Sequence, residues 1–400
     1  MPTEKGAVLL FLRVDEAQRR DTLTPFDGFW LARGCYAETW RLGGLETRLA
    51  RRFNWICRVV VIGTAVGCCL RCGGVGENGP ELALRPGITL DFSQFPAGKP
   101  LHMVAYGDSR FADPALTTGT NPRVRKWLVD RIAEVHPAVL LLTGDTPYHG
   151  ASPDDWRVFE QETQPWRKEG ILVLPTTGNH EVLGGAEPGI TNYLDHFPEI
   201  ERHRSFSALL GNVEVISLDM DSEGADTDRQ AIWFGQQLEH VPAQVDFLMI
   251  LFHMPWMVDE QTETLLRLPS ADALLYRRVL EAHLDKLRAR VLVLNGHIHN
   301  YERFESRGVE YVVTGGGGAE PYPLLIRGSA DLYHDHPRGH PVYHYLTLDV
   351  NGRTLSATMW RVQDPDANAL TVDADDSFTL TAAAPPAKGK SKAKANSAKQ

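Results

Sequence analysis

Five short pieces of the chain carry side chains that can bind a metal ion, and four of them also contain glycine. They are Gly107-Asp108, Gly144-Asp145, Gly178-Asn179-His180-Glu181, His253 and Gly296-His297-Ile298-His299. Their carboxylate, amide and imidazole donors suit zinc, iron, manganese or a similar metal. The donors are too many for one catalytic ion that keeps a position open. Two ions roughly 3.5–4 Å apart need a shared ligand, and a carboxylate can bridge them.

Each piece follows a short run that is rich in Val, Ile and Leu and apolar on both faces. Such runs predict strands that are buried in a sheet covered by helices. The five runs cover residues 101–106, 139–142, 171–174, 247–252 and 291–294. Ligands of such sheets bind beyond the carboxyl ends of the strands, where all five pieces fall.

Helical patterns lie between the runs, at residues 122–135, 153–164, 228–240 and 271–289. The first has Asn121 as its N-cap and Pro122 at its first position, and the second follows Ser152 and Pro153 in the same way. Alternating strands and helices predict an α/β fold. Residues 309–313, 342–349 and 353–362 read as strands without helices, and we expect them to complete a second sheet.

In their order along the chain, the five pieces resemble the calcineurin-like metallophosphoesterases over residues 101–303, about half of the sequence. A Gly-Asp dipeptide is common, and Gly-Asn-His-Glu alone is a moderate signal, but five pieces in order form a strong one. The resemblance implies two mixed β-sheets packed as a sandwich flanked by helices, which is the four-layer fold of that family. It also implies two metal ions and the hydrolysis of phosphate esters.

One position departs from the general family pattern. The family usually places a metal-binding His two residues after the first Asp, but this chain has Arg110, which stays cationic and cannot coordinate a metal. Tyr148, three residues after Asp145, could replace the missing donor. This arrangement resembles the purple acid phosphatases, where a tyrosinate binds ferric iron. The alternative for Tyr148 is an aromatic side chain that packs in a loop.

Two further segments resemble the purple acid phosphatases. Residues 297–303 match their GHxHxYER motif with the preceding glycine, and residues 253–256 match their HxPW segment. The plant enzymes carry substrate-contacting histidines after the second motif, whereas residues 257–270 contain none. Later histidines, amid Tyr333, Tyr343 and Tyr345, could form a rim that replaces these contacts or lie exposed in loops. They are His334, His336, His340 and His344.

The resemblance assigns the donors to individual ions, which the spacing alone does not. The first metal would be held by Asp108, Asp145, Tyr148 and His299. The second would be held by Asp145, Asn179, His253 and His297, with Asp145 as the bridge. The implied metals are Fe(III) in the first site and Fe(II), Zn or Mn in the second.

Two residues near the donors are expected to act on the substrate. In the family, the residue that matches His180 contacts the phosphate or protonates the leaving oxygen; the alternative is a His that orients a metal ligand. Glu181 would then orient His180, or would be a simple surface acid. Arg110 could bind the substrate phosphate through two N–H groups, or pair with a ligand carboxylate.

Other prominent residues have structural explanations. The run at 315–318 is all Gly but lacks the Lys-Ser/Thr of a Walker motif, and we expect it to pass close to the metals or to turn sharply. The tryptophans in the helical patterns are most simply core residues. They are Trp127, Trp156, Trp166 and Trp233.

The composition excludes several classes of protein. Of the 400 residues, 43% are hydrophobic and 23% charged, so the chain is neither disordered throughout nor a multi-span membrane protein. The net charge of −10 argues against a nucleic-acid partner bound through bulk charge. The five Cys all lie at or before Cys72, so the long C-terminal part has neither a disulfide framework nor thiolate chemistry.

Residues 51–72 resemble a secretory leader. Arg51 and Arg52 precede an apolar core at 59–70, which is too short for a membrane span of ~20 residues but fits a signal-peptide core of ~7–15. The run ends in a sequence similar to a bacterial lipoprotein box, so a lipid on Cys68 would anchor the protein to a membrane outside the cytoplasm. The segment does not start the chain, and the alternative is a buried element of a cytoplasmic protein.

We therefore expect five segments: an N-terminal extension at 1–50, the leader-like segment at 51–72, a linker with an edge strand at 73–98, a catalytic domain at 99–381, and a basic tail at 382–400. The tail is rich in Ala, Lys, Pro and Ser, a composition typical of disorder.

The function that follows is hydrolysis of small phosphomonoesters by a metal-bound hydroxide. The alternative is a phosphodiesterase that acts on nucleotides or lipid head groups. A non-catalytic, envelope-anchored protein that binds phosphate ligands is less favoured, because such a module needs neither His180 nor a full set of metal donors.

Overall fold

The computed structural model describes residues 87–221, 225–258, 269–322, 330–333 and 342–383. The leader-like segment with Cys68 and the tail after residue 383 lie outside this part of the chain, as do His334, His336 and His340. No helix in the described ranges has both the length and the hydrophobicity needed to cross a membrane.

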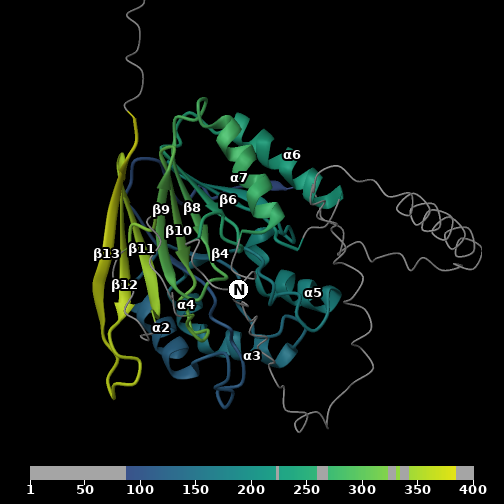
Figure 1. Ribbon diagram of the computed structural model, residues 1–400, viewed down its shortest axis with the longest axis vertical. Helices are drawn as coiled ribbons and strands as arrows, with labels where there is room; N and C mark the ends of the chain where they lie inside the picture. The colour runs from purple at the N-terminus through teal and green to yellow at the C-terminus, as the bar shows by residue number, and fades with distance from the viewer. Residues whose placement is uncertain (1–86, 222–224, 259–268, 323–329, 334–341, 384–400) are drawn as a thin grey trace, which may run out of the picture. The chain divides into compact units, whose positions relative to one another are not determined.

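Two mixed β-sheets form the centre of the fold (Figure 1). The six-stranded sheet has the order β13-β12-β11-β2-β3-β4, and the seven-stranded sheet has the order β1-β5-β6-β7-β8-β10-β9. The strands of the first are β2 (Leu101–Tyr106), β3 (Val139–Leu142), β4 (Leu172–Pro175), β11 (His344–Asn351), β12 (Thr354–Val362) and β13 (Val372–Thr381). Those of the second are β1 (Ile88–Asp91), β5 (Phe206–Leu210), β6 (Val213–Ser217), β7 (Phe247–Leu251), β8 (Arg290–Asn295), β9 (Tyr301–Ser306) and β10 (Val309–Thr314).

Helices flank both sheets, which confirms the predicted α/β fold. They are α2 (Pro122–Glu134), α3 (Pro153–Glu162), α4 (Gln164–Lys168), α5 (Ala186–His196), α6 (Ala225–Glu239) and α7 (Ala271–His283), with a 3-10 turn η3 (Pro198–Ile200).

The predicted helix starts are present. The Asn121 and Ser152 side chains accept the predicted N-cap hydrogen bonds, from the main-chain N–H groups of Val124 and Asp155. The helix predicted at 153–164 ends at Glu162, and α4 starts anew with Pro165 in its first turn, because a proline ring does not fit inside a continuous helix.

The five strands that precede the polar pieces are divided between the two sheets. β2, β3 and β4 are parallel neighbours in the six-stranded sheet, and β7 and β8 are parallel neighbours in the seven-stranded sheet. The expectation of one sheet for all five was therefore wrong. The carboxyl ends of both parallel sets lead into the same group of loops, and this meeting point is the site described below.

The C-terminal strands also divide, so they do not together complete one sheet. β10 pairs with β8 and β9, whereas β11 pairs with β2 and β12. β5 and β6 form a hairpin around Gly211 and Asn212 that was not predicted. Gly211 has a φ of +68°, a conformation that Gly adopts readily, and the Gly-Asn pair between two apolar runs is a hairpin signal.

Alternate residues of the central strands face two different hydrophobic clusters. In β7, Met249 and Leu251 pack between the two sheets, while Leu248 and Ile250 pack with Tyr276 of α7. The first cluster extends through the six-stranded sheet to apolar residues of α2, α3, α4 and α5, and the second joins the seven-stranded sheet to α6 and α7. These contacts produce four layers, helix, sheet, sheet and helix, with strands that are buried on both faces.

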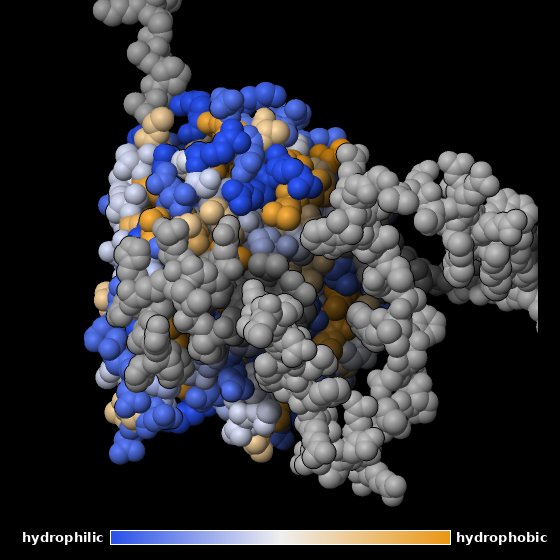
Figure 2. Space-filling view, in the orientation of Figure 1, coloured by the Kyte–Doolittle hydropathy of each residue, from blue (hydrophilic) through white to orange (hydrophobic). Residues whose placement is uncertain are grey.

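The tryptophans behave largely as expected. Trp156 and Trp166 are fully buried, while Trp127 and Trp233 are half-buried against the two clusters. The face seen in Figure 2 mixes hydrophilic and hydrophobic residues. Large hydrophobic side chains exposed in the described ranges are Leu183, Ile232, Leu274 and Leu332.

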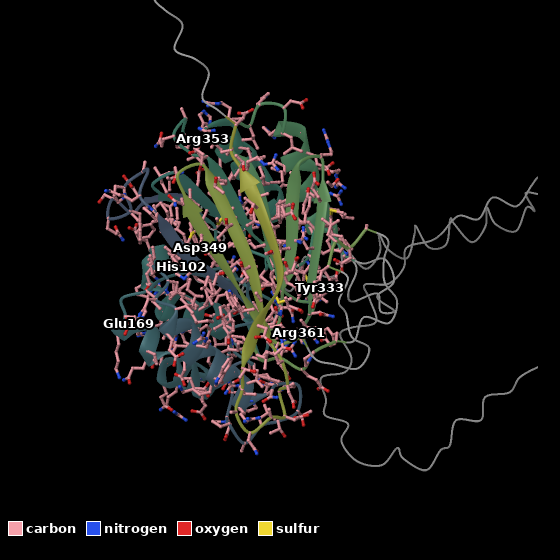
Figure 3. All side chains as sticks on the ribbon, turned by 90° about the vertical axis from the view of Figure 1, so that its left-hand side faces the viewer. His102, Glu169, Tyr333, Asp349, Arg353 and Arg361 are labelled. Carbon is pink, nitrogen blue, oxygen red and sulfur yellow. The ribbon has the colours of Figure 1, made fainter. Side chains whose placement is uncertain are left out.

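The residues of the expected rim that the structure describes are buried. His344 is completely buried, and Tyr333, Tyr343 and Tyr345 are at most 5% exposed. The Tyr333 hydroxyl donates to Asp375 over 2.5 Å, and Arg361 donates to the same carboxylate. Tyr333 and Arg361 are labelled in Figure 3. Both interpretations of His344, a substrate-contacting rim and an exposed loop, were therefore wrong.

Candidate metal centre

The loops after β2, β3 and β7 bring three buried metal-binding side chains together. Asp108, Asp145 and His253 each offer one ligand atom, and these atoms lie within 4.8 Å of one another. Asp108 follows β2, Asp145 follows β3 and His253 follows β7, so the cluster is assembled from both sheets. All three residues are fully buried.

The four residues proposed for the second metal converge on one another. The Asn179 Oδ1 atom lies 3.2 Å from His253 Nε2 and 3.0 Å from His297 Nδ1. Asp145 Oδ1 lies 3.2 Å from the same His253 nitrogen. The structure therefore brings together the complete set that the resemblance implies for this ion.

Three of the four residues proposed for the first metal also meet. His299 Nε2 lies 3.6 Å from Asp108 Oδ1, and Asp108 shares the buried cluster with Asp145. The Nε2 atom of His299 is buried and, within the described residues, has no hydrogen-bond partner. A buried nitrogen without a partner is costly unless a ligand uses it.

Tyr148, the fourth residue proposed for the first metal, lies beside this cluster and is half-buried. Its ring packs edge-on against His180, with ring centres 5.5 Å apart, and lies under the Arg110 guanidinium. Its hydroxyl lies against Gly119, where it would be 3.1 Å from an added Cβ. Tyr148 thus packs between loops at the edge of the donor cluster.

Main-chain carbonyls orient the histidines. The Nδ1 atom of His253 forms a hydrogen bond to the Thr143 carbonyl at 2.8 Å. The Nδ1 atom of His299 forms one to the Glu320 carbonyl at 2.6 Å. Because a carbonyl only accepts, each Nδ1 carries the proton, and each Nε2 is left as a lone-pair donor toward the carboxylates.

Burial keeps these imidazoles neutral. It lowers the pKa of His253 to about 4 and lowers the pKa of His299 well below its usual range. A neutral imidazole is the form that binds a metal.

The two buried carboxylates repel each other. Burial and the charge of Asp145 raise the pKa of Asp108 well above its usual range. Burial also acts to raise the pKa of Asp145, but His253, His180 and Arg110 outweigh it and hold that pKa low. Two such groups within one cluster are stabilised as anions when cations lie between them.

Four residues of the site have a left-handed backbone that is unusual for residues other than glycine. Asp108, Arg110, Asp145 and His297 have φ angles of +55°, +48°, +52° and +69°. Backbone strain of this kind persists where surrounding contacts hold it and is concentrated at functional sites.

Glycine precedes several of the donors because the loops approach one another too closely for a side chain. An added Cβ at Gly178 would lie 2.4 Å from Asp145 Oδ1, and one at Gly296 would lie 2.5 Å from Asp108 Oδ2. The run at 315–318 passes equally close, since a Cβ at Gly315 would lie 2.9 Å from Asp108 Oδ2. This agrees with the expectation that the glycine run lies next to the site.

Glu181 has a role that the sequence analysis missed. Its carboxylate is fully buried and accepts three main-chain hydrogen bonds, from Asp145 at 3.0 Å, Thr146 at 2.8 Å and Gly178 at 2.7 Å. It therefore ties the loop of Asp145 to the loop of Asn179 and neither orients His180 nor lies on the surface. Its place in the Gly-Asn-His-Glu piece was a signal of importance, but the role depends on contacts between distant segments.

The two residues expected to act on substrate lie at the edge of the donor cluster. His180 donates from Nδ1 to the Tyr148 carbonyl at 2.5 Å, which directs Nε2 to within 3.8 Å of Asp145 Oδ2. Arg110 places Nη2 3.5 Å from Asp145 Oδ2, the ion pair considered as the alternative to phosphate binding. Its Nε is buried and has no partner in the described part of the chain, so a donor remains for a ligand.

These observations fit a metal centre. The neutral imidazoles of His253 and His299, an amide oxygen and crowded carboxylates face one another. The buried Nε2 of His299 has no hydrogen-bond partner among the described residues. Mixed nitrogen and oxygen donors of this kind suit zinc, iron or manganese.

Comparison with solved structures shows the same fold in two other proteins. The purple acid phosphatase PPD1 from yellow lupin (Lupinus luteus) seeds is 17% identical, with a TM-score of 0.52 over 72% of this chain and 55% of the lupin chain. GAP50 of Plasmodium, described as the anchor in the inner membrane complex, is 12% identical, with a TM-score of 0.52 over 71% of this chain and 90% of that one. This chain thus spans little more than half of the lupin enzyme, and no match was found among curated proteins.

The family model for calcineurin-like phosphoesterases matches residues 102–301. This range is half of the chain and contains every donor of the cluster, from Asp108 to His299. Members of this family hydrolyse phosphate esters with the help of bound metal ions. The chain therefore belongs to the calcineurin-like phosphoesterase family.

Proposed function

We propose that this protein hydrolyses phosphomonoesters at a pair of metal ions held as in the purple acid phosphatases. The observation that carries the proposal is the convergence of Asp108, Asp145, Asn179, His253, His297 and His299 from the loops of two sheets. The bound ions would supply a hydroxide at neutral pH and neutralise charge on the phosphate. Asp145, which reaches both groups of donors, would bridge them.

We propose Fe(III) for the first site and Fe(II), Zn or Mn for the second. The support is chemical: Arg110 stands where a ligand would be expected, so the first site lacks a donor, and Tyr148 lies beside the cluster. Phenolate oxygen is a hard donor that suits ferric iron.

Arg110 and His180 would handle the phosphate group. Arg110 Nε has no hydrogen-bond partner among the described residues, and a guanidinium group can donate two parallel N–H groups to phosphate oxygens. His180 keeps its Nδ1 proton on the Tyr148 carbonyl, so its Nε2 is the atom free to exchange a proton with an ester oxygen. A chain used only to bind phosphate would not need this complete arrangement.

An activity panel tests the proposal. The full chain, loaded in turn with Fe, Zn and Mn, is assayed on an aryl phosphomonoester and on the matching diester. We expect metal-dependent turnover with a higher kcat/KM for the monoester. A higher value for the diester would replace the proposed substrate class, and no turnover with any metal would favour a binding role.

The visible spectrum tests the iron assignment. A ferric tyrosinate gives a charge-transfer band that Tyr148→Phe abolishes, whereas Tyr345→Phe leaves it in place, because Tyr345 is a buried tyrosine of β11 that packs on Trp360. A colourless, fully active protein without iron would contradict the Fe(III) assignment.

A further inference from the structure

A buried arginine, Arg125, supports the loop that carries Arg110. Arg125 lies in the first turns of α2, and its side chain is completely buried. Burying a guanidinium is costly unless all of its donors find partners. The partners of Arg125 therefore show what the residue supports.

Arg125 has five N–H groups, and the structure gives it five acceptors. Nε and Nη2 donate to the two oxygens of Glu162, over 3.0 and 2.7 Å. Nη2 also donates to the Ala112 carbonyl at 3.1 Å, and Nη1 donates to the Arg110 carbonyl at 3.0 Å and the Thr120 hydroxyl at 3.4 Å. Glu162 at the end of α3 thus holds the guanidinium in place, and the guanidinium holds the loop.

The same loop is held from its other side by the segment after β3. Arg110 donates its main-chain N–H to the Asp145 carbonyl at 3.1 Å, and Phe111 donates to the Thr146 carbonyl at 2.8 Å. The Arg125 guanidinium lies 5.1 Å from the centre of the Phe111 ring. Arg110 is therefore fixed between two sets of hydrogen bonds while its φ is +48°, a conformation that needs such support.

We infer that Arg125 is a positioning residue that acts through Arg110, holding its backbone so that its guanidinium faces the phosphate of the substrate. This inference rests on the phosphoesterase function proposed above. Lysine cannot replace Arg125, because an ammonium group has only three N–H donors. It also lacks the planar geometry with which the guanidinium donates two hydrogen bonds to the Glu162 carboxylate.

The test is a double-mutant cycle on the metal-loaded full chain with Arg125→Lys and Arg110→Ala. The readouts are kcat/KM for an aryl phosphomonoester and the dissociation constant of inorganic phosphate from calorimetry. We expect Arg125→Lys to reduce both affinity and kcat/KM about tenfold when Arg110 is present. In the Arg110→Ala background it should change neither by more than about twofold.

A matched control lies on the same helix. Arg123 also donates to loop carbonyls, those of Pro365, Ala367 and Asn368, but these belong to the β12–β13 connection. Arg123→Lys should leave phosphate affinity unchanged. If Arg125→Lys does not fold, Glu162→Gln is the second variant. It keeps the size of the partner but weakens the paired hydrogen bonds between Arg125 and residue 162. Its effect should show the same dependence on Arg110.

Equal losses from Arg125→Lys with and without Arg110 would overturn the inference, because the effect would then be general destabilisation. Unchanged phosphate affinity in Arg125→Lys would overturn it as well. If the unmodified protein neither binds phosphate nor hydrolyses the ester, the proposed function fails instead.

Discussion

Main-chain groups orient several individual residues of the site. Carbonyls orient His253, His299 and His180, and Glu181 receives three main-chain N–H bonds. This arrangement leaves the remaining imidazole nitrogens and carboxylate oxygens for ligands. Replacing a residue that orients donors should therefore affect metal binding without removing a ligand.

Glu181→Gln tests this at the residue scale. The Gln amide would point an N–H toward a main-chain donor, so one hydrogen bond is lost and the remaining donor is buried unpaired. We expect the free energy of unfolding to fall by about 1–3 kcal/mol, with a lower melting temperature and weaker metal retention. Glu187→Gln is the control, because Glu187 is exposed on α5. A Glu181→Gln protein with the same melting temperature as the wild type would contradict the role assigned to the carboxylate.

The donors themselves could be predicted from sequence because each lies just after an apolar run, and most of them also lie close to a glycine. The role of Glu181 could not, because the N–H groups of Asp145, Thr146 and Gly178 meet only when two loops fold together. The placement of the Tyr148 ring against His180 likewise depends on packing that no spacing reveals.

Among the elements, the strands position the donors and the glycines allow the loops to meet. The apolar runs predicted the five strands, because strands buried on both faces need apolar residues throughout. Their division between two sheets was not predictable. β4 and β7 are both short apolar strands, and what separates them is the strands with which each pairs. The β5–β6 hairpin was not predicted, although its Gly-Asn pair is a turn signal in the sequence.

Gly178→Ala tests the element scale. Its Cβ would lie 2.5 Å from the main-chain nitrogen of Asp145, which cannot move without shifting β3 or its loop. We expect loss of bound metal and of activity, and a destabilisation larger than that of Gly170→Ala. Gly170 is the control, because no atom lies within 4 Å of its added Cβ, although its φ of +69° costs about 1 kcal/mol for alanine. Equal destabilisation of both variants, with metal retained, would contradict the close approach of the loops.

For the molecule as a whole, burial of Asp108 and Asp145 at the junction of two sheets links metal binding to stability. Ions that bind only the folded state stabilise it by mass action. We expect chelation to lower the melting temperature by several degrees, and added metal to restore it. The Asp108→Asn protein should respond less to chelation, and a melting temperature that is indifferent to chelator would contradict the link.

The pH dependence of stability offers a second test at this scale, away from the metal donors. His344 donates from Nδ1 to the Val342 carbonyl and lies 3.0 Å from the Thr314 hydroxyl, and burial lowers its pKa from 6.5 to about 4. The unfolded chain takes up this proton below about pH 6.5, whereas the folded chain does so only near pH 4. Stability is therefore lost as the pH falls through this window, by up to about 3 kcal/mol.

Urea unfolding of the metal-free wild type and His344→Gln proteins between pH 7 and pH 4 measures this contribution. The wild type should lose more stability than the variant across the window, because glutamine does not titrate. Parallel curves for the two proteins would contradict the assignment to His344.

The most direct test of the central claim is the metal content of the wild type and Asp145→Asn proteins, measured per chain by mass spectrometry alongside phosphomonoester turnover. Asp145 reaches both groups of donors, so two ions per active wild-type chain are expected, and the substitution should abolish both metal retention and hydrolysis. Two ions retained in an active Asp145→Asn protein, or turnover by a wild-type protein free of metal, would contradict the account.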